Sequence, residues 1–564
     1  MENDEIEFEI TNIGPIKRSI IHIKNITTIL GLPNSGKSYA LRSIYWFLQL
    51  LDEYRFKEFG GLINHVKSDE ILENKIMNDM NKEIEKELSD VINDFTSNKQ
   101  NSSTHGVYKN NIKINYKINL EKLKLLIKGV FKDTLKQYTG SSNITNIKVN
   151  GKSMDTIIDD SISEIPIFGS EYSKNDNGLQ FMYSIARNLN FGPQKYYDIM
   201  NKLRRNPLTV TVNSLNFSKA GTSISVDVTF LISRASDEYL NDRMAFRGFD
   251  FPSSNTSIEN FPYMGIIISN VSEHIWASII NFSLNNIKSA ISDISGINST
   301  KFIPYGRNII VQLYNSSLKR ILYYPGTILR DLSVLKSAPF SSYFKWLDAG
   351  KEKLNSDQNE LISLFNFIIN GEIKSDSNTN ALKYFFGDNK SVDINLSSAM
   401  VEEITGLMLP IISSNDKDLI IIEEPEAQLH ISTQIIMGIL LVALAKKKDI
   451  KIIFSTHSDT LVIVMNYLLT QHIEKNDVQN LVKAIYNNQF SQDNLNDLIN
   501  VFDDKKKIDI KFYSNKDDKF MLIDNKDILK EIPGITDFID RLFNWSIGVI
   551  SKTQKDQNGE NKND

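Results

Sequence analysis

A glycine-rich loop near the start of the chain constrains the fold more than any other sequence feature. The segment Gly31-Leu-Pro-Asn-Ser-Gly36-Lys37-Ser38 satisfies every fixed position of the pattern G-x-x-x-x-G-K-[S/T]. An apolar run at 27–30 precedes it, and apolar residues at helical spacing follow it between 38 and 53. A strand, glycine loop and helix in this order direct N–H groups and a helix N-terminus toward an anion. The segment is therefore predicted to bind the phosphates of a nucleotide.

The residue types in this loop indicate ATP together with a magnesium ion. Lys37 can neutralise the β- and γ-phosphates, and the Ser38 hydroxyl can ligate Mg²⁺. The other candidate nucleotide-binding residues of the loop and the first helical turn are Gly31, Asn34, Ser35, Gly36 and Tyr39. The alternative is a chance glycine turn before a helix, and the flanking strand and helix favour the phosphate loop over it.

A second apolar segment, at 419–422, ends in two adjacent carboxylates. Ligands of α/β sheets bind at the carboxyl ends of strands, and successive side chains along a strand point to opposite faces. Glu423 can hold Mg²⁺, directly or through water, and Glu424 can polarise the attacking water. A strand that ends in acidic residues is common by itself, so this interpretation depends on the phosphate loop.

A third apolar segment, Lys451-Ile-Ile-Phe-Ser, leads to His457. A single histidine is usually structural, but one at a strand end in the same sheet as the acids is a candidate contact for the γ-phosphate. A helix is predicted at 431–446, between the two strands. Buried strands that alternate with helices predict an α/β fold with a parallel arrangement.

Composition excludes several classes of site. The chain has no cysteine, so disulfides, cysteine nucleophiles and thiolate metal sites are excluded. Its net charge of −5 argues against a strongly basic nucleic-acid clamp, although a local basic patch is compatible with it. The acidic N-terminus does not resemble a signal peptide, and the apolar run 435–445 is shorter than the about 20 residues of a membrane span. A cytoplasmic protein without a membrane partner is expected.

Together the motifs resemble those of the ABC-class ATPases, and more closely the soluble branch that includes OLD-family, RecF-like and SMC-like AAA proteins. The resemblance covers about 5–55 and 390–470. The runs that carry it are Asn12-Ile-Gly-Pro-Ile-Lys17, the phosphate loop with Tyr39, Ile422-Glu-Glu-Pro-Glu-Ala-Gln-Leu-His430, Phe454-Ser-Thr-His-Ser-Asp459 and the Pro-x-x-Arg stretch in Phe302-Ile-Pro-Tyr-Gly-Arg307. The resemblance implies an ABC-type P-loop ATPase head with a mixed sheet, split by a large α+β insertion.

The same resemblance implies a homodimer joined through the ATPase heads. In this family a signature motif begins a helix and donates to the γ-phosphate of ATP bound by a second subunit. Leu396-Ser397-Ser398-Ala399-Met400 stands in that place, with Ser397 as the hydroxyl donor. Ala399 replaces the usual glycine, and Glu423 replaces the commoner aspartate. The glutamine that usually links the metal to the inserted arm has only Gln312 as a candidate.

The positions of the motifs predict how the chain is divided. The expected parts are 1–55 and 391–475 as the two halves of the ATPase head, 56–390 as an inserted α+β and helical module, 476–550 as a C-terminal extension and 551–564 as a disordered tail. Within the insertion, a helix is predicted at 71–95 and hairpin strands at 208–212 and 223–231.

Three functions remain open from the sequence. The first is an ATP-hydrolysing dimer switch that acts on nucleic acid or a partner effector, in DNA repair or antiviral defence. The second is an OLD-type nuclease, which is disfavoured because no Toprim acidic pattern follows His457, and Asp524 and Asp527 have the wrong spacing. The third is a non-hydrolytic ATP-gated scaffold, which the Ala399 departure leaves open. A membrane-transporter ATPase is disfavoured by the large insertion.

Overall fold

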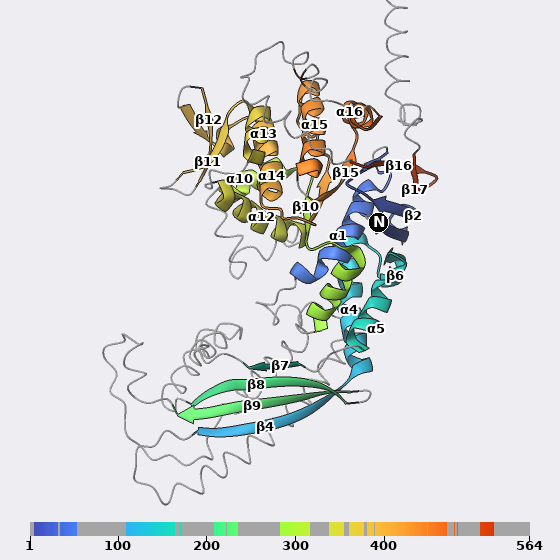
Figure 1. Cartoon of the computed structure of the whole chain (residues 1–564), viewed down its shortest axis with the longest axis vertical. Helices are drawn as coiled ribbons and strands as arrows, with labels where there is room; N and C mark the ends of the chain where they lie inside the picture. The colour runs from blue at the N-terminus through green and yellow to red at the C-terminus, as the bar shows by residue number, and fades with distance from the viewer. Residues whose placement is uncertain are drawn as a thin grey trace, which may run out of the picture. The chain divides into compact units, whose positions relative to one another are not determined.

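The protein divides into two units that are each held together by their own contacts (Figure 1). The computed structural model describes residues 5–31, 34–53, 109–163, 168–171, 208–220, 223–234, 283–315, 338–354, 360–376, 381–387, 390–447, 449–470, 479, 482 and 508–523. The first unit comprises Met1–Glu53, Thr134–Met154 and Ile291–Asp564, and the second comprises Tyr54–Asp133 and Asp155–Ala290. The domain ranges expected from the sequence stay a prediction.

The first unit contains a six-stranded mixed sheet in the order β10-β14-β15-β3-β16-β17. Its strands are β10 (Thr300–Ile303), β14 (Leu419–Glu423), β15 (Lys451–Thr456), β3 (Ile26–Leu30), β16 (Ile510–Lys516) and β17 (Lys519–Leu522). The first five run parallel, and β17 is antiparallel to β16. Strands β3 and β14 are buried along their whole length, as continuous apolar strands in a sheet covered on both faces should be. The predicted α/β fold with a mixed sheet is confirmed.

The carboxyl ends of the three central strands lie along one edge of this sheet. The register pairs Glu423 with Ser455 and Thr456 with Leu30. The segments that follow β14, β15 and β3 are therefore neighbours, although they come from opposite ends of the chain. This edge is where α/β sheets bind their ligands.

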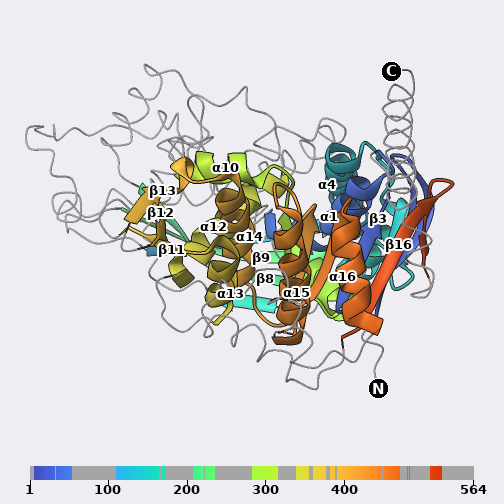
Figure 2. The same ribbon diagram turned by 90° about the horizontal axis from the view of Figure 1, so that it is seen from above.

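Helices from the C-terminal half of the first unit pack beside one another on this sheet (Figure 2). The helices that lie wholly within the described parts of the unit are α1 (Lys37–Glu53), α10 (Arg307–Asn315), α12 (Ala338–Leu354), α13 (Glu360–Ile369), α14 (Ala399–Ile412), α15 (Ile431–Lys447) and α16 (Asp459–Thr470). The predicted helix at 431–446 is confirmed as α15, whose apolar residues from Ile436 to Ala445 are buried in the core. None of the helices in the described ranges is long and apolar enough to cross a membrane.

Two contacts with α12 fix the position of helix α14. Pro410 has no N–H, so the carbonyl of Gly406, four residues earlier, has no helical donor. The buried Tyr343 hydroxyl donates to that carbonyl at 2.7 Å. Helix α12 crosses α14 closely, because a Cβ on Gly350 would lie 2.1 Å from the Leu409 carbonyl oxygen. The position of α14 is therefore fixed by its neighbours along its length.

Two small antiparallel sheets complete the first unit. One has the order β2-β1-β5-β6 and the other has the order β11-β12-β13. Their strands are β1 (Ile6–Ile13), β2 (Ile16–Ile23), β5 (Ile147–Val149), β6 (Lys152–Ser153), β11 (Glu372–Ser375), β12 (Leu382–Phe386) and β13 (Lys390–Asp393). A 3₁₀ turn, Ile394–Leu396, leads from β13 to Ser397 and the start of α14.

The second unit contains a four-stranded antiparallel sheet in the order β4-β9-β8-β7. Its strands are β4 (Lys109–Asn119), β7 (Phe168–Glu171), β8 (Leu208–Ala220) and β9 (Ser223–Arg234), and the helices α4 (Leu120–Thr139) and α5 (Met154–Ser163) cross the boundaries between the units. The predicted hairpin is confirmed as β8 and β9, with a register shift between Val212 and Ser214. The predicted helix at 71–95, the predicted tail and Asp524–Asp527 lie outside the described residues.

Candidate functional site

The phosphate loop connects β3 to α1 with the strained backbone that its sequence allows. Gly31 has φ 149°, Asn34 has φ 62° and Gly36 has φ 93°, and residues with a Cβ rarely adopt such positive values. Close packing gives Gly36 a second role, because a Cβ there would lie 2.9 Å from Cγ of Pro15. The loop is thus shaped by glycines and packed against the turn between β1 and β2.

Two further residues hold the loop and the helix that follows it. The Asn515 side-chain amide, on β16, donates to the Ser35 carbonyl at 2.6 Å. The Tyr39 ring covers Gly14, where a Cβ would lie only 2.6 Å from the ring. Sequence reasoning missed Asn515, because nothing in the sequence indicates that a residue 480 positions away contacts Ser35.

Lys37 lies at the start of α1 with its side chain folded into the loop. Its ammonium group donates to the Gly31 carbonyl at 2.7 Å, and only 6% of the residue is exposed. Burial lowers the pKa of Lys37 to about 8, while the carboxylates of Glu424 and Glu426 act in the opposite direction. Because burial disfavours the charged form, an anion that enters the loop would restore a favourable partner to this cation.

Glu423 ends β14 with a buried carboxylate. Its Oε2 accepts from the N–H of Tyr305 at 3.3 Å, and its Oε1 lies 3.6 Å from Nε of Arg42 on α1. Oε1 is buried and receives no hydrogen bond. The exposed Ser38 lies at the start of the same α1 helix. A buried carboxylate oxygen without a donor, together with a hydroxyl, is a donor set that suits Mg²⁺ completed by phosphate and water oxygens.

Glu424 turns away from the strand and faces His457. It has φ 47°, and its N–H donates to the Ser455 carbonyl at 3.0 Å. Its Oε1 lies 3.4 Å from Nε2 of His457, with both side chains about one-third exposed. Burial and the Lys37 charge lower the pKa of His457 below its usual 6.5, and Glu424 opposes them. The structure therefore brings together the two residues predicted to be catalytic.

Glu426 supports His457 from beneath, and sequence reasoning assigned it no role. Its Oε1 accepts from the Thr456 hydroxyl and from the His457 N–H, both at 2.7 Å. Burial raises the pKa of Glu426 above its usual value, although those two hydrogen bonds act in the opposite direction. Its place in the acidic run after β14 is the signal that would have drawn attention to it.

Arg307 was quoted in the sequence only as part of a Pro-x-x-Arg stretch, yet it contacts the same strand end. It is fully buried, and its guanidinium donates to the carbonyls of Glu423 at 2.9 Å and Glu424 at 3.0 Å. Its Nε lies 2.8 Å from Oε2 of Glu403 on α14. Several aligned donors on one side chain suit a guanidinium and not a lysine ammonium.

Ser397 is half-buried in the turn that precedes α14. Its hydroxyl donates to the Ile394 carbonyl at 2.6 Å, so its hydrogen bond lies within its own turn and not at the phosphate loop. Ser398 is the helix N-cap, and its Oγ accepts from the Val401 N–H at 3.4 Å. Leu396, beside Ser397, is 76% exposed. The predicted signature serine is thus separate from the residue that caps the helix.

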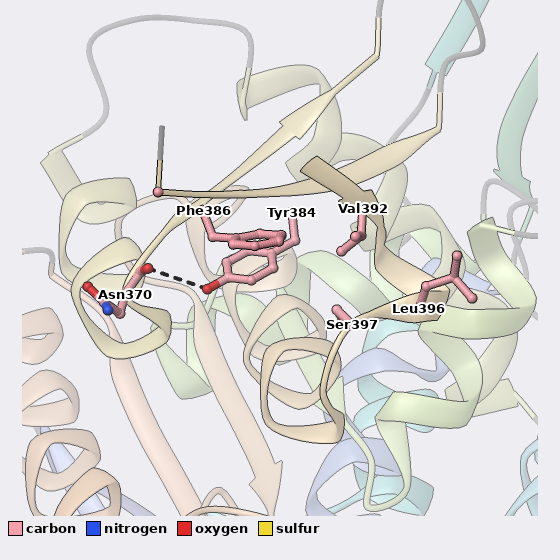
Figure 3. Close-up of a pocket in the computed structure, with 7 residues that line it drawn as sticks. Asn370, Tyr384, Phe386, Val392, Leu396 and Ser397 are labelled. Carbon is pink, nitrogen blue, oxygen red and sulfur yellow. Dashed lines mark hydrogen bonds between the residues drawn. The ribbon is translucent and has the colours of Figure 1, made fainter. Parts of the chain in front are cut away.

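A shallow hollow adjoins this turn (Figure 3). The rings of Tyr384 and Phe386 stack there with their centroids 5.5 Å apart, because residues two apart on β12 share a face. The Tyr384 hydroxyl donates to the carbonyls of Ile369 and Asn370, the latter drawn dashed in Figure 3. Ser397 and Leu396 line the same hollow.

Gln312, the candidate for the metal-linked glutamine, is engaged elsewhere. Its amide nitrogen donates to both carboxylate oxygens of Glu402 on α14, at 2.9 and 2.8 Å. The interaction ties α10 to α14 and does not involve Glu423. Among the described residues, no group of three histidine, aspartate or glutamate side chains is arranged to hold a metal. A magnesium ion would depend on Ser38, Glu423 and the nucleotide.

Comparison with known proteins identifies the family. Residues 6–462, more than half of the chain, match the family model described as "AAA ATPase domain". None of the curated proteins compared with the chain matches it. Several solved structures show a weak overall similarity, and all those described below are SMC head domains.

An SMC head bound to the C-winged helix domain of ScpA is 9% identical with a TM-score of 0.27, and the alignment covers 93% of this chain and 99% of that one. The SMC head of Thermotoga maritima is 10% identical with a TM-score of 0.26, covering 92% and 98%. A Pyrococcus furiosus SMC head bound to the C-terminal domain of ScpA is 9% identical with a TM-score of 0.26, covering 93% and 97%.

Because these TM-scores are low, the fold is assigned from the strand order and the phosphate loop of this chain. The family match spans that loop, both acidic residues after β14 and the histidine after β15. The chain therefore belongs to the family of AAA ATPase domain proteins.

Proposed function

We propose that this chain binds ATP with Mg²⁺ at the carboxyl edge of its parallel sheet and hydrolyses it to ADP and phosphate. The observation that carries the proposal is the 3.4 Å approach of the Glu424 carboxylate to the His457 ring. These groups follow the ends of neighbouring strands, and the Glu424 charge acts on the pKa of both Lys37 and His457. A base, a hydrogen-bond donor and a cation are therefore near enough to influence one another, and the γ-phosphate would lie among them.

Binding is assigned to the loop and to the helix that follows it. The Lys37 ammonium group would exchange its hydrogen bond with Gly31 for the phosphate oxygens. The backbone N–H groups of the loop and the N-terminus of α1 add donors and partial positive charge. The other nucleotide-binding residues of the proposal are Asn34, Ser35, Gly36, Ser38 and Tyr39.

Magnesium is assigned to Ser38 and Glu423. The buried Oε1 of Glu423 receives no hydrogen bond in the structure, so this oxygen is available to bind the ion. When bound, the ion would neutralise charge on the transferred phosphoryl group. Arg42 lies on the same side, with its Nε 3.6 Å from that oxygen.

Hydrolysis is assigned to Glu424 and His457. Glu424 would accept a proton from the water that attacks the γ-phosphorus as the bond to the bridging oxygen breaks and ADP leaves. His457 is neutral at pH 7, because its pKa lies below 6.5, and its ring N–H can donate to a γ-phosphate oxygen. Glu426 fixes the backbone from which this ring projects.

A second copy of the chain is proposed to complete each site with its Ser397. The support is the position of Ser397 between the exposed residues Leu396 and Ser398, ahead of the helix that begins at Ala399. The motif resemblance supplies the head-to-head arrangement and the idea of an ATP-driven switch. On the same ground, we propose that the protein acts in the cytoplasm on a partner effector or nucleic acid, in DNA repair or antiviral defence.

The test is the rate of ATP hydrolysis with Mg²⁺ over a range of protein concentrations, for the wild type and Glu424→Gln. Turnover that rises faster than linearly with protein, and falls by about a hundredfold or more in the variant, supports a dimeric ATPase. The matched control is Glu121→Gln, whose side chain is 72% exposed on α4 and should behave as the wild type.

Other outcomes would replace the proposal. ATP binding without turnover under any condition favours the non-hydrolytic scaffold, whose sequence support is Ala399 at the start of α14. Metal-dependent cutting of DNA by the isolated chain would favour the nuclease. Wild-type turnover in Glu424→Gln would move the role of base to another residue.

A further inference from the structure

One buried side chain joins the catalytic turn to the helix that follows Ser397. Arg307 begins α10 and is fully buried. Its Nη1 donates to the Glu423 carbonyl and its Nη2 to the Glu424 carbonyl, while its Nε pairs with Glu403. A buried charge is tolerated when it is paired and hydrogen-bonded, and here the Glu403 carboxylate pairs with the guanidinium while two main-chain carbonyls accept its hydrogen bonds.

The two carbonyls belong to the residues whose side chains the proposed reaction uses. Glu424 has φ 47°, a backbone conformation that residues with a Cβ adopt rarely. The turn is held by the Glu424 N–H bond to Ser455 on one side and by the guanidinium of Arg307 on the other. Because Arg307 contacts the main chain and not the carboxylates, its effect is on the direction in which the carboxylates point.

The same guanidinium also contacts α14. Glu403 lies in the second turn of that helix and is buried, and Gly406, one turn later, leaves space for the Arg307 stem. A Cβ on Gly406 would lie 3.2 Å from Cβ and Cγ of Arg307. Helix α14 follows directly on Ser397 and Ser398, so a displacement of this helix would reach the Glu423–Glu424 turn through one side chain.

We propose that Arg307 is a positioning residue that fixes the Glu423–Glu424 turn and couples it to α14, the helix that follows Ser397. The inference rests on the proposed ATPase function and assigns a means by which a contact at Ser397 changes the rate of hydrolysis. The role assigned to Arg307 does not alter the groups that bind the nucleotide, because Arg307 lies at the acidic strand end and not in the phosphate loop.

The chain offers a matched control for this residue. Lys301, on β10, is also a buried cation, and its ammonium group donates to the Pro410 carbonyl at 3.1 Å and to the Ser413 hydroxyl at 2.7 Å. It therefore contacts the opposite end of the same helix. Lys301→Met removes a buried cation from the packing around α14 and leaves the contacts of Glu423 and Glu424 in place.

The first measurement is steady-state ATP hydrolysis together with equilibrium binding of a fluorescent ATP analogue. Arg307→Lys keeps the charge but loses the fork of donors, and kcat is expected to fall by about tenfold or more while nucleotide affinity changes by less than about threefold. Glu403→Gln should give a smaller fall of the same kind, and Arg307→Met a larger one. Lys301→Met should keep kcat, even if it lowers the melting temperature.

The second measurement does not need turnover, so it separates this inference from the proposed function. The His457 pKa is read from the chemical shift of its ring carbon in the full chain, with His457→Gln to assign the signal. The charged groups that act on the ring are Lys37, which lowers its pKa, and Glu424, which raises it. If Arg307 holds the Glu424 turn, Arg307→Lys should lower the His457 pKa, since the carboxylate then moves away.

Each result decides the inference. An unchanged kcat and an unchanged His457 pKa in folded Arg307→Lys would overturn it, and so would an equal loss of kcat in Lys301→Met. If the wild type does not hydrolyse ATP, the proposed function fails, and the His457 pKa alone decides whether Arg307 positions Glu424. If Arg307→Met does not fold, Arg307→Lys and Glu403→Gln give the comparison.

Discussion

Oε1 of Glu424 lies 3.4 Å from Nε2 of His457, across the ends of two adjacent parallel strands. Beside this contact, Glu424 has a positive φ, Arg307 donates to the Glu424 carbonyl, and Glu426 accepts from the His457 N–H. Glu424 and His457 are far apart in the sequence, and the register of β14 against β15 brings them together. Five predictions concern this arrangement and the packing around it.

Complementation between two inactive variants tests the shared site. Lys37→Ala removes the loop cation and should abolish ATP binding, and Ser397→Ala should keep binding but lose turnover. In a mixed head-to-head dimer, one of the two sites has both an intact Lys37 and the partner's intact Ser397. Mixing the variants should therefore restore ATP hydrolysis that neither shows alone. Absence of any recovery, with dimers present by light scattering, would contradict the shared site.

The acid side of the pH–rate profile should report His457. Burial and the Lys37 charge hold its pKa below 6.5. Protonation of the ring would pair it with Glu424, the proposed base, so kcat should fall with a midpoint below pH 6.5. Glu424→Gln removes the opposing carboxylate, so the His457 pKa should drop further, as read by NMR. A midpoint above 6.5 that His457→Gln does not remove would exclude this assignment.

The same shift has a defined sign for stability. Between its lowered pKa and 6.5, the folded His457 binds fewer protons than the unfolded chain does. The free energy of unfolding therefore decreases as the pH falls through that window, and the loss should be absent in His457→Gln.

Asn515 should support nucleotide affinity from outside the loop. Asn515→Ala removes the 2.6 Å bond to the Ser35 carbonyl, which is expected to cost about 1 kcal/mol and to weaken ATP binding by about fivefold. The control is Asn298→Ala, which removes a bond of the same kind to the Asp416 carbonyl, at 3.3 Å, away from the site. Equal affinities of both variants by calorimetry would show that the loop does not depend on β16.

Gly350→Ala should destabilise the packing of α12 against α14. The added Cβ would lie 2.1 Å from the Leu409 carbonyl oxygen, a backbone atom that can move only with the helix. The free energy of unfolding should fall by about 2 kcal/mol or more. In Gly438→Ala on α15, the nearest atom is a Val464 side-chain carbon at 3.0 Å, so the higher helix propensity of alanine should largely offset the crowding. Equal melting temperatures would contradict the difference.

Several features of the site could be predicted from the sequence because they depend on local patterns. The fixed positions of the phosphate loop, and the apolar segments before Glu423 and His457, each identify a strand end without reference to the rest of the chain. Parallel strands bring such ends to one edge, so the neighbourhood of Lys37, Glu424 and His457 followed from the alternation of strands and helices. The predicted mixed sheet was confirmed on the same basis.

Other features were decided only by the tertiary structure. Ser398, and not Ser397, caps α14, which depends on where the helix begins and not on the residue types alone. Gln312 pairs with Glu402, so the sequence could name a glutamine but not its partner. Asn515 and Arg307 reach the site from strands and helices remote in sequence. Periodicity reports which face of an element is buried, whereas a single side-chain contact depends on how distant elements pack against one another.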